Sequence, residues 1–137
     1  MDGHKSLRVF QLAYTLAMEI FRISRTFPKE ERYSLTDQIR RSSRSVPANI
    51  AEGYQKRQYP NAFTNKMSDA DGEATETQVW LDISLDCGYI DGKTHERLIS
   101  EYKQVGSMLG HMINNPTKFK PRVSTLPTAT ANRQQGK

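Results

Sequence analysis

The 137-residue chain has few of the residues that cross-link a small protein or bind metals in it. Its one cysteine, Cys87, excludes an internal disulfide and a cysteine-based metal cluster, which is typical of a reducing compartment. Aromatic residues make up only 9% of the sequence. This low content suits a thin helical bundle better than the thick core of a large enzyme. No segment approaches the roughly 20 consecutive apolar residues that a membrane span needs.

The most apolar N-terminal stretch, residues 9–18, does not resemble a signal peptide. Gln11 and Thr15 interrupt it, and Glu19 follows it directly. We therefore expect a cytoplasmic protein that has no membrane partner.

Catalytic and metal-binding patterns are also missing. The three histidines are far apart in the sequence: His4, His95 and His111. A di-iron bundle needs Glu-x-x-His motifs, but the positions three residues before the last two histidines are Gly92 and Met108. No glycine-rich loop could cradle a phosphate, and we expect Cys87 to be a buried thiol at a helix end. The sequence thus predicts no enzymatic activity, no metal and no cofactor.

Four segments with helical periodicity account for most of the chain: residues 6–26, 34–57, 61–87 and 93–114. The connections between them are short and contain proline, glycine or asparagine. This order predicts an all-α fold, an up-down-up-down antiparallel four-helix bundle over residues 1–116. Residues 117–137 are rich in Pro, Thr, Lys and Gln without a period, and we expect a disordered basic C-terminal tail.

The first segment is apolar on two sides. One series of apolar residues consists of Leu7, Phe10, Tyr14, Ala17 and Phe21, and the other of Val9, Ala13, Leu16, Ile20 and Ile23. Together they are too wide for a helix that covers one side of a small core. Such a helix is either central or shared with a neighbouring subunit, so we expect an oligomer.

Two residues inside the predicted helices are unusual there. Pro47 would normally end or kink a helix, but the apolar spacing continues through it, which predicts one kinked helix. Gly72 costs roughly 1 kcal/mol of helix propensity. Close packing of another helix against it would compensate for that cost.

Charge is unevenly distributed. Residues 1–66 carry 12 Lys and Arg against 6 Asp and Glu, whereas residues 67–114 carry 3 against 9. The last 23 residues carry five basic residues and no acidic ones. The bundle is therefore neutral but polarised, which favours pairing between helices or between subunits.

Five basic residues of the second segment are the candidate nucleic-acid-binding residues: Arg40, Arg41, Arg44, Lys56 and Arg57. Fixed positive charge on one helix face can contact phosphates without reading the base sequence. The same arginines could instead form a solvated face, a subunit interface, or ion pairs with the acidic third segment. The sequence leaves these alternatives open.

A family resemblance rests on the first loop and the second segment. The residues that carry it are Phe27-Pro28, Glu30, Tyr33, Leu35, Gln38-Ile39-Arg40-Arg41-Ser42 and Ser45-Val46-Pro47-Ala48-Asn49-Ile50-Ala51-Glu52-Gly53, followed by Glu76-Thr77-Gln78 and Cys87-Gly88-Tyr89-Ile90. They resemble the bacterial four-helix-bundle proteins encoded in 23S rRNA intervening sequences, over residues 7–113. The segment 68–73 departs from the glycine- and serine-rich pattern of many members.

The resemblance implies a homopentamer. It also implies similarity to the accessory protein of diversity-generating retroelements, which binds nucleic acid and a reverse transcriptase. It offers no enzymatic activity to transfer. Two hypotheses follow: an oligomeric scaffold that contacts RNA or DNA backbone, helped by the basic tail, or a purely structural oligomer that binds proteins, for example a reverse transcriptase.

Overall fold

The computed structural model describes residues 3–121, which fold into four long helices. The helices are α1 (Arg8–Ser24), α2 (Leu35–Gln55), α3 (Pro60–Asp86) and α4 (Gly92–Asn114). Three short 3₁₀ helices accompany them: η1 (Gly3–Ser6), η2 (Lys29–Glu31) and η3 (Pro116–Phe119). The described residues contain no strand, and the predicted all-α class is confirmed.

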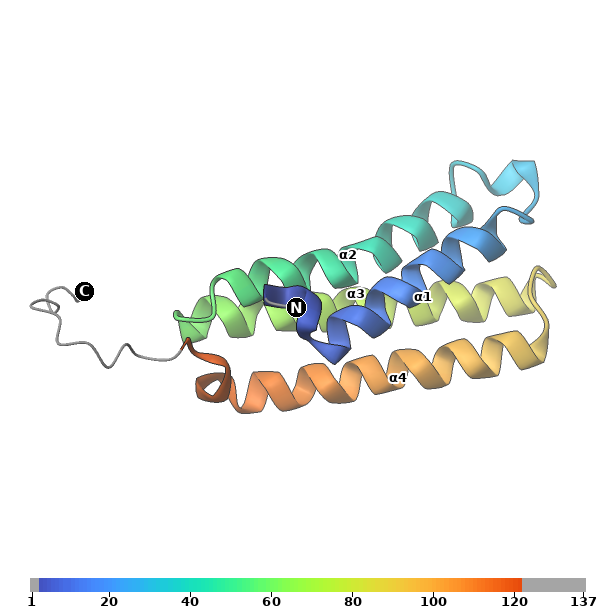
Figure 1. Cartoon of the computed structure of the whole chain (residues 1–137). Helices are drawn as coiled ribbons and strands as arrows, with labels where there is room; N and C mark the ends of the chain where they lie inside the picture. Colours follow the sequence, from blue (N-terminus) through green and yellow to red (C-terminus); the bar gives the residue numbers. More distant parts are fainter. Residues whose placement is uncertain (1–2, 122–137) are drawn as a thin grey trace, which may run out of the picture.

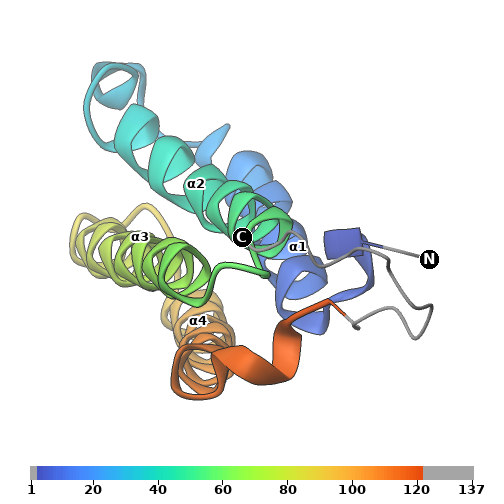
Figure 2. The same cartoon turned by 90° about the vertical axis from the view of Figure 1, so that its left-hand side faces the viewer.

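Successive helices run in opposite directions and surround one core (Figures 1 and 2). Each of α1 and α3 packs against both α2 and α4. As a result, α3 lies diagonally across the bundle from α1. The α1–α2 connection and the α3–α4 connection meet at the same end of the bundle, where Phe27 and Tyr89 have ring centroids 5.3 Å apart.

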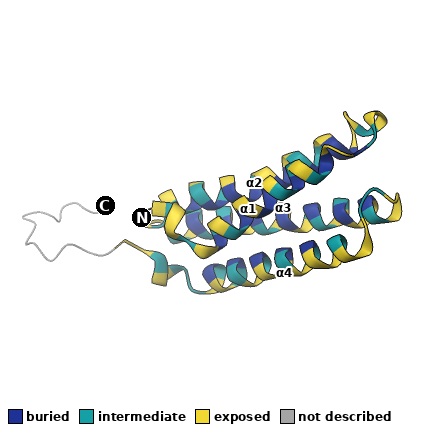
Figure 3. Ribbon diagram, turned by 45° about the vertical axis from the view of Figure 1, so that its right-hand side comes forward, coloured by how far each residue is buried: buried dark blue, intermediate teal, exposed yellow. Residues whose placement is uncertain are grey.

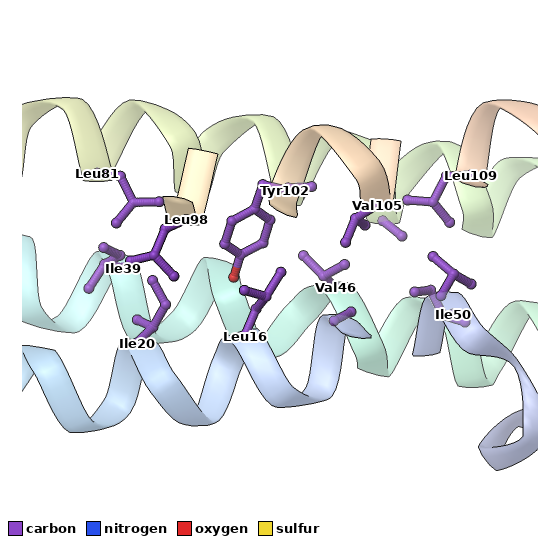
Figure 4. Packing of buried hydrophobic residues seen from close by; sticks show 14 of the residues in the cluster. Leu16, Ile20, Ile39, Val46, Ile50, Leu81, Leu98, Tyr102, Val105 and Leu109 are labelled. Carbon is purple, nitrogen blue, oxygen red and sulfur yellow. The ribbon is translucent and has the colours of Figure 1, made fainter. Parts of the chain in front are cut away.

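The interior is a continuous apolar seam along the bundle axis, and buried positions recur once per helical turn on the inner faces (Figures 3 and 4). Its largest fully buried side chains include Leu16, Ile20, Ile39, Ile50, Phe63, Leu98 and Tyr102. One polar pair lies within this seam: the hydroxyls of Ser42 on α2 and Thr77 on α3 are 2.8 Å apart. Because a buried hydroxyl without a partner is costly, this pair favours a single register of α2 against α3.

The two apolar series of the first predicted helix have different environments. Val9, Ala13, Leu16 and Ile20 are buried, as a core face should be. On the other face only Ala17 is buried; the side chain of Tyr14 is 55% exposed, and that of Met18, beside it, is 39% exposed. Residues 3–121 of a single chain therefore leave the second apolar face of α1 largely uncovered.

Helix α2 continues through Pro47, which is itself buried, so the prediction of one helix across this proline is confirmed. Gly53 does not end the helix, because α2 extends to Gln55. Instead Gly53 lies at a close approach of α2 to α3. A β-carbon there would be 2.6 Å from Met67 Cε and 2.8 Å from Lys66 Cβ.

Three expectations from the sequence need correction. Cys87 is exposed, not buried, because α3 ends one residue before it. Gly72 is exposed, and no other part of residues 3–121 comes within 4 Å of the position that a β-carbon would occupy, so none of the described helices packs closely on it. Residues 117–119 belong to the folded body, because Phe119 stacks on Phe63 at 5.6 Å between ring centroids. The remaining predicted tail, residues 122–137, lies outside the described residues.

Two helix glycines should respond in opposite ways to substitution by alanine. Gly53→Ala forces α2 and α3 apart and should lower the free energy of unfolding, although alanine is the better helix former. At Gly110 of α4 nothing lies within 4 Å of an added β-carbon. Gly110→Ala should therefore raise the free energy of unfolding by about 0.5–1 kcal/mol. Urea unfolding measures the free energy of unfolding of both variants. A higher value for Gly53→Ala would contradict the close approach of α2 to α3 at Gly53.

The hydroxyl of Tyr102 is fully buried and makes no hydrogen bond within the described residues. Burial raises the pKa of this phenol, with a smaller effect of the Glu19 charge. Since an unsatisfied buried polar group costs about 1–3 kcal/mol, Tyr102→Phe should raise the melting temperature. A clear fall in the melting temperature would show that the hydroxyl has a stabilising partner.

Candidate nucleic-acid interface

The α1–α2 hairpin places three arginines around one half-buried aromatic ring. Arg25 at the end of α1 and Arg40 and Arg44 on α2 have their guanidinium carbons 5.6, 4.9 and 5.7 Å from the ring centroid of Phe21. These distances are in the range of cation–π contacts. We call Phe21 with Arg25, Arg40 and Arg44 the arginine corner.

The guanidinium groups of the arginine corner have no acidic partner among residues 3–121. Arg40 donates from Nε to Ser24 Oγ at 2.7 Å, and none of the three arginines forms an ion pair there. Burial, followed by the charges of Arg44 and Arg25, lowers the pKa of Arg40. The like charges therefore repel one another without a carboxylate that compensates them.

Two adjoining depressions extend the positive surface toward the α1–α2 connection. One is lined by Arg32, Thr36, Asp37, Arg40, Arg41 and Arg44, and the other by Ser24, Arg25, Phe27, Lys29, Arg32 and Arg40 among others. Arg32 and Arg40 border both. A hollow surface with several fixed cations and a single carboxylate, Asp37, is suited to a phosphate-rich ligand.

Arg41 borders the first depression but is paired with acidic residues of the same chain. It donates a hydrogen bond to Glu76 and lies 3.4 Å from Glu73, both on α3. The hydrogen bond to Glu76 is the main cause that raises the pKa of Arg41. For this residue the structure therefore shows ion pairing with the acidic third helix, one of the alternatives that the sequence left open.

Lys56 and Arg57 are also separate from the arginine corner. They follow the end of α2, and 16 residues between Arg40 and Lys56 correspond to roughly 24 Å along a helix. Arg57 lies 4.1 Å from the ring centroid of Tyr54 and donates to its carbonyl at 3.0 Å. The five residues predicted from the sequence therefore lie in three places: Arg40 with Arg44 in the arginine corner, Arg41 beside the acidic residues of α3, and Lys56 with Arg57 at the far end of α2.

Sequence reasoning missed Arg25, Lys29, Arg32 and the aromatic ring of Phe21. Each belongs to the end of α1 or to the connection after it, not to the second helix. The available signal was the short connection between two antiparallel helices, which must bring the last turn of α1 beside the first turns of α2.

A carboxylate at the bundle end holds this connection in place. Glu31 accepts hydrogen bonds from Ser34 Oγ at 2.7 Å, from Tyr89 Oη at 2.8 Å and from the Leu35 amide at 3.3 Å. Tyr89 lies between α3 and α4, so Glu31 links the two connections. The bonds from Ser34 and Tyr89 lower the pKa of Glu31, and the bond to Glu31 raises the pKa of Tyr89 to about 12.

These pKa shifts predict a pH dependence. A carboxyl with a lowered folded-state pKa contributes stability that is complete above its ordinary pKa of 4.5 and is lost as the pH falls through the lowered value. Tyr89→Phe should raise the pKa of Glu31 toward 4.5 and reduce this acid-dependent loss of stability. Carbon NMR titration of the Glu31 carboxyl measures the shift, and an unchanged pKa in the variant would disprove the Tyr89 contact.

The part of the chain between residues 3 and 121 holds no cluster of three or more His, Cys, Asp or Glu residues that could bind a metal ion. None of the helices described there has an apolar stretch of the length that a membrane crossing requires.

Comparison with known proteins agrees with this architecture. Residues 5–111 match the family described as the 23S rRNA-intervening sequence protein. The chain belongs to this family. A similar solved structure is that of a protein with unknown function from the S23 ribosomal protein family of Bacteroides thetaiotaomicron. It is 27% identical with a TM-score of 0.70, and the match covers 77% of this chain and 97% of that chain. No curated protein matches the sequence.

Proposed function

We propose that this member of the 23S rRNA-intervening sequence protein family is a non-enzymatic, oligomeric helical scaffold in the cytoplasm. It binds the phosphate backbone of RNA or DNA at the arginine corner and the adjoining Lys29 and Arg32. The observation that carries this proposal is the group of three guanidiniums around Phe21 without a carboxylate partner in the described chain.

Phosphate contact explains why such a cluster would be retained. Three like charges held together cost free energy in the unbound protein, and a polyanion removes that cost. Because three guanidiniums already surround the Phe21 ring, the corner offers charge and not a free surface for base stacking. Recognition of this kind depends on salt and shows little base preference.

Oligomerisation would multiply these contacts. The uncovered apolar face of α1 supports association of copies, and the family resemblance favours five of them. Repeated corners on one assembly would bind a long polyanion with avidity, although each contact is weak.

A second candidate function is binding of a protein partner, for example a reverse transcriptase, without a direct role for nucleic acid. It is favoured by the apolar groove between α1 and α2, which continues from the arginine corner and is lined by Phe10, Tyr14 and Met18 among others. A partner helix with acidic and apolar side chains would fit both the arginine corner and the apolar groove.

The test compares two double variants that each remove two positive charges. Arg25 and Arg32 are exposed residues of the α1–α2 connection, and Lys93 and Lys103 are exposed residues of α4. Arg25→Ala/Arg32→Ala should lower affinity for a structured RNA hairpin by about tenfold, because each exposed contact contributes roughly 0.5–1 kcal/mol. It should also reduce the slope of log affinity against log salt by about 2.

The control Lys93→Ala/Lys103→Ala should leave the affinity and the slope close to those of the unchanged protein. Fluorescence anisotropy at several salt concentrations measures both quantities. Equal losses in the two variants would show that only net charge matters, and no RNA binding at physiological salt would favour the protein-partner alternative.

A further inference from the structure

The proposed scaffold leaves open which surfaces of the subunit meet. Apolar side chains are uncovered at three places on the described residues: a groove between α1 and α2, the outer side of α3, and a depression between α1 and α4 that Leu7, Met108 and Phe119 border. The first two are the pair that differs in charge. The first is the groove between α1 and α2, which is lined mainly by Phe10, Tyr14, Met18, Arg44, Ala48 and Ala51. We call it the α1–α2 groove.

The second surface is the outer side of α3. Gly72, Thr75, Val79 and Ile83 follow one another at helical spacing of three, four and four residues, and all are exposed. Val79 is 47% exposed and Ile83 is 39% exposed, and they lie one turn apart on the same face of α3. We call these four residues the α3 ridge.

The groove and the ridge lie on different sides of the bundle. Since α3 is diagonal to α1, its outer side points away from the α1–α2 groove (Figure 2). The two surfaces of one chain therefore cannot cover each other. Two copies can bring them together, and the free groove and ridge that remain at the ends can bind further copies.

Shape supports this pairing. Gly72 lies mid-helix, where glycine costs roughly 1 kcal/mol of helix propensity, and no other helix among residues 3–121 approaches it. A helix that lacks a side chain at its exposed centre lets bulky side chains of another surface approach its backbone. Phe10, Tyr14 and Met18 provide such side chains on the wall of the groove.

Charge supports it as well. The groove belongs to the half of the sequence with 12 basic and 6 acidic residues, and the ridge to the half with 3 basic and 9 acidic residues. Arg44 lines the groove, and Asp69 is exposed one turn before Gly72. Neither forms an ion pair within residues 3–121. Opposite charges at the two surfaces favour their contact and disfavour contact of groove with groove or of ridge with ridge.

From these observations we infer that the α1–α2 groove binds the α3 ridge of a second copy of this chain. The contact is head-to-tail, so that each subunit uses its groove toward one neighbour and its ridge toward the other. In the assembled protein Arg44 belongs to this contact and no longer to the phosphate site, whereas Arg25, Arg32 and Arg40 lie outside the groove and remain available to phosphate. The inference rests on the oligomeric part of the proposed function and specifies the surfaces involved.

Two variants break one surface each. Met18→Asp places a charge in the apolar groove, and Gly72→Arg places a long cationic side chain in the centre of the ridge. Because arginine is a good helix former and Gly72 is exposed, Gly72→Arg should leave the subunit folded while it abolishes association. Matched controls on α4 are Ser100→Asp, at an exposed position among polar side chains, and Gly110→Arg, which should leave association unchanged.

The decisive experiment mixes the two broken variants. By light scattering each alone should be a monomer near the chain mass of 15.7 kDa. An equimolar mixture should form a dimer of twice that mass, because the intact ridge of the Met18→Asp chain fits the intact groove of the Gly72→Arg chain. Circular dichroism confirms that each variant is folded.

Several results would overturn the inference. The inference is wrong if the protein without substitutions is a monomer or if either variant alone still assembles. It is also wrong if the α4 control variants dissociate or if the mixture of the two variants stays monomeric. RNA binding reports separately on the proposed function: the monomeric Gly72→Arg chain should still lose affinity when Arg25 and Arg32 are replaced. A successful mixing experiment without any RNA binding would reject the phosphate site and leave the head-to-tail contact in place.

Discussion

The structure depends on a mismatch between one helix and the bundle that contains it. Helix α1 is apolar on two sides, but a four-helix bundle has one interior and can bury only one of them. The buried side, from Val9 to Ile20, holds α1 against α2 and α4. The other side, with Tyr14 and Met18, becomes one wall of the α1–α2 groove. Full burial of a large apolar side chain is worth roughly 1.5–3 kcal/mol, and because Tyr14 is 55% and Met18 39% exposed, about half of that remains to be gained at each when a partner covers them.

The contact between α2 and α3 determines which arginines are available for binding. Gly53 lets the two helices approach closely at one end, and the Ser42–Thr77 pair fixes their register near the middle. In that register Arg41 meets Glu73 and Glu76. Arg40 and Arg44 face the opposite way, toward α1, where they meet the last turn of α1 and its Arg25. The same packing thus neutralises one arginine and gathers three others.

Local patterns were enough to predict the helices but not the grouping of charged side chains. The apolar periodicity gave four helices, and it continued correctly through Pro47, because the inner positions of α2 repeat on both sides of that residue. It could not show that Arg41 and Arg44, three residues apart on one helix, face different neighbours. That difference depends on the packing angle and register of α2 between α1 and α3. The environment of Gly72 could not be predicted either, since an exposed glycine and a closely packed one look alike in a sequence.

The central claim is that the uncovered side of α1 is buried in the working protein. Oxidative footprinting at increasing protein concentration tests it directly, because it reads the solvent access of single side chains. The account predicts that Tyr14 and Met18 become protected as the subunits associate. Tyr33, which is 86% exposed in the α1–α2 connection, should stay reactive. Tyr14 and Met18 that remain as reactive as Tyr33 at every concentration would contradict the account.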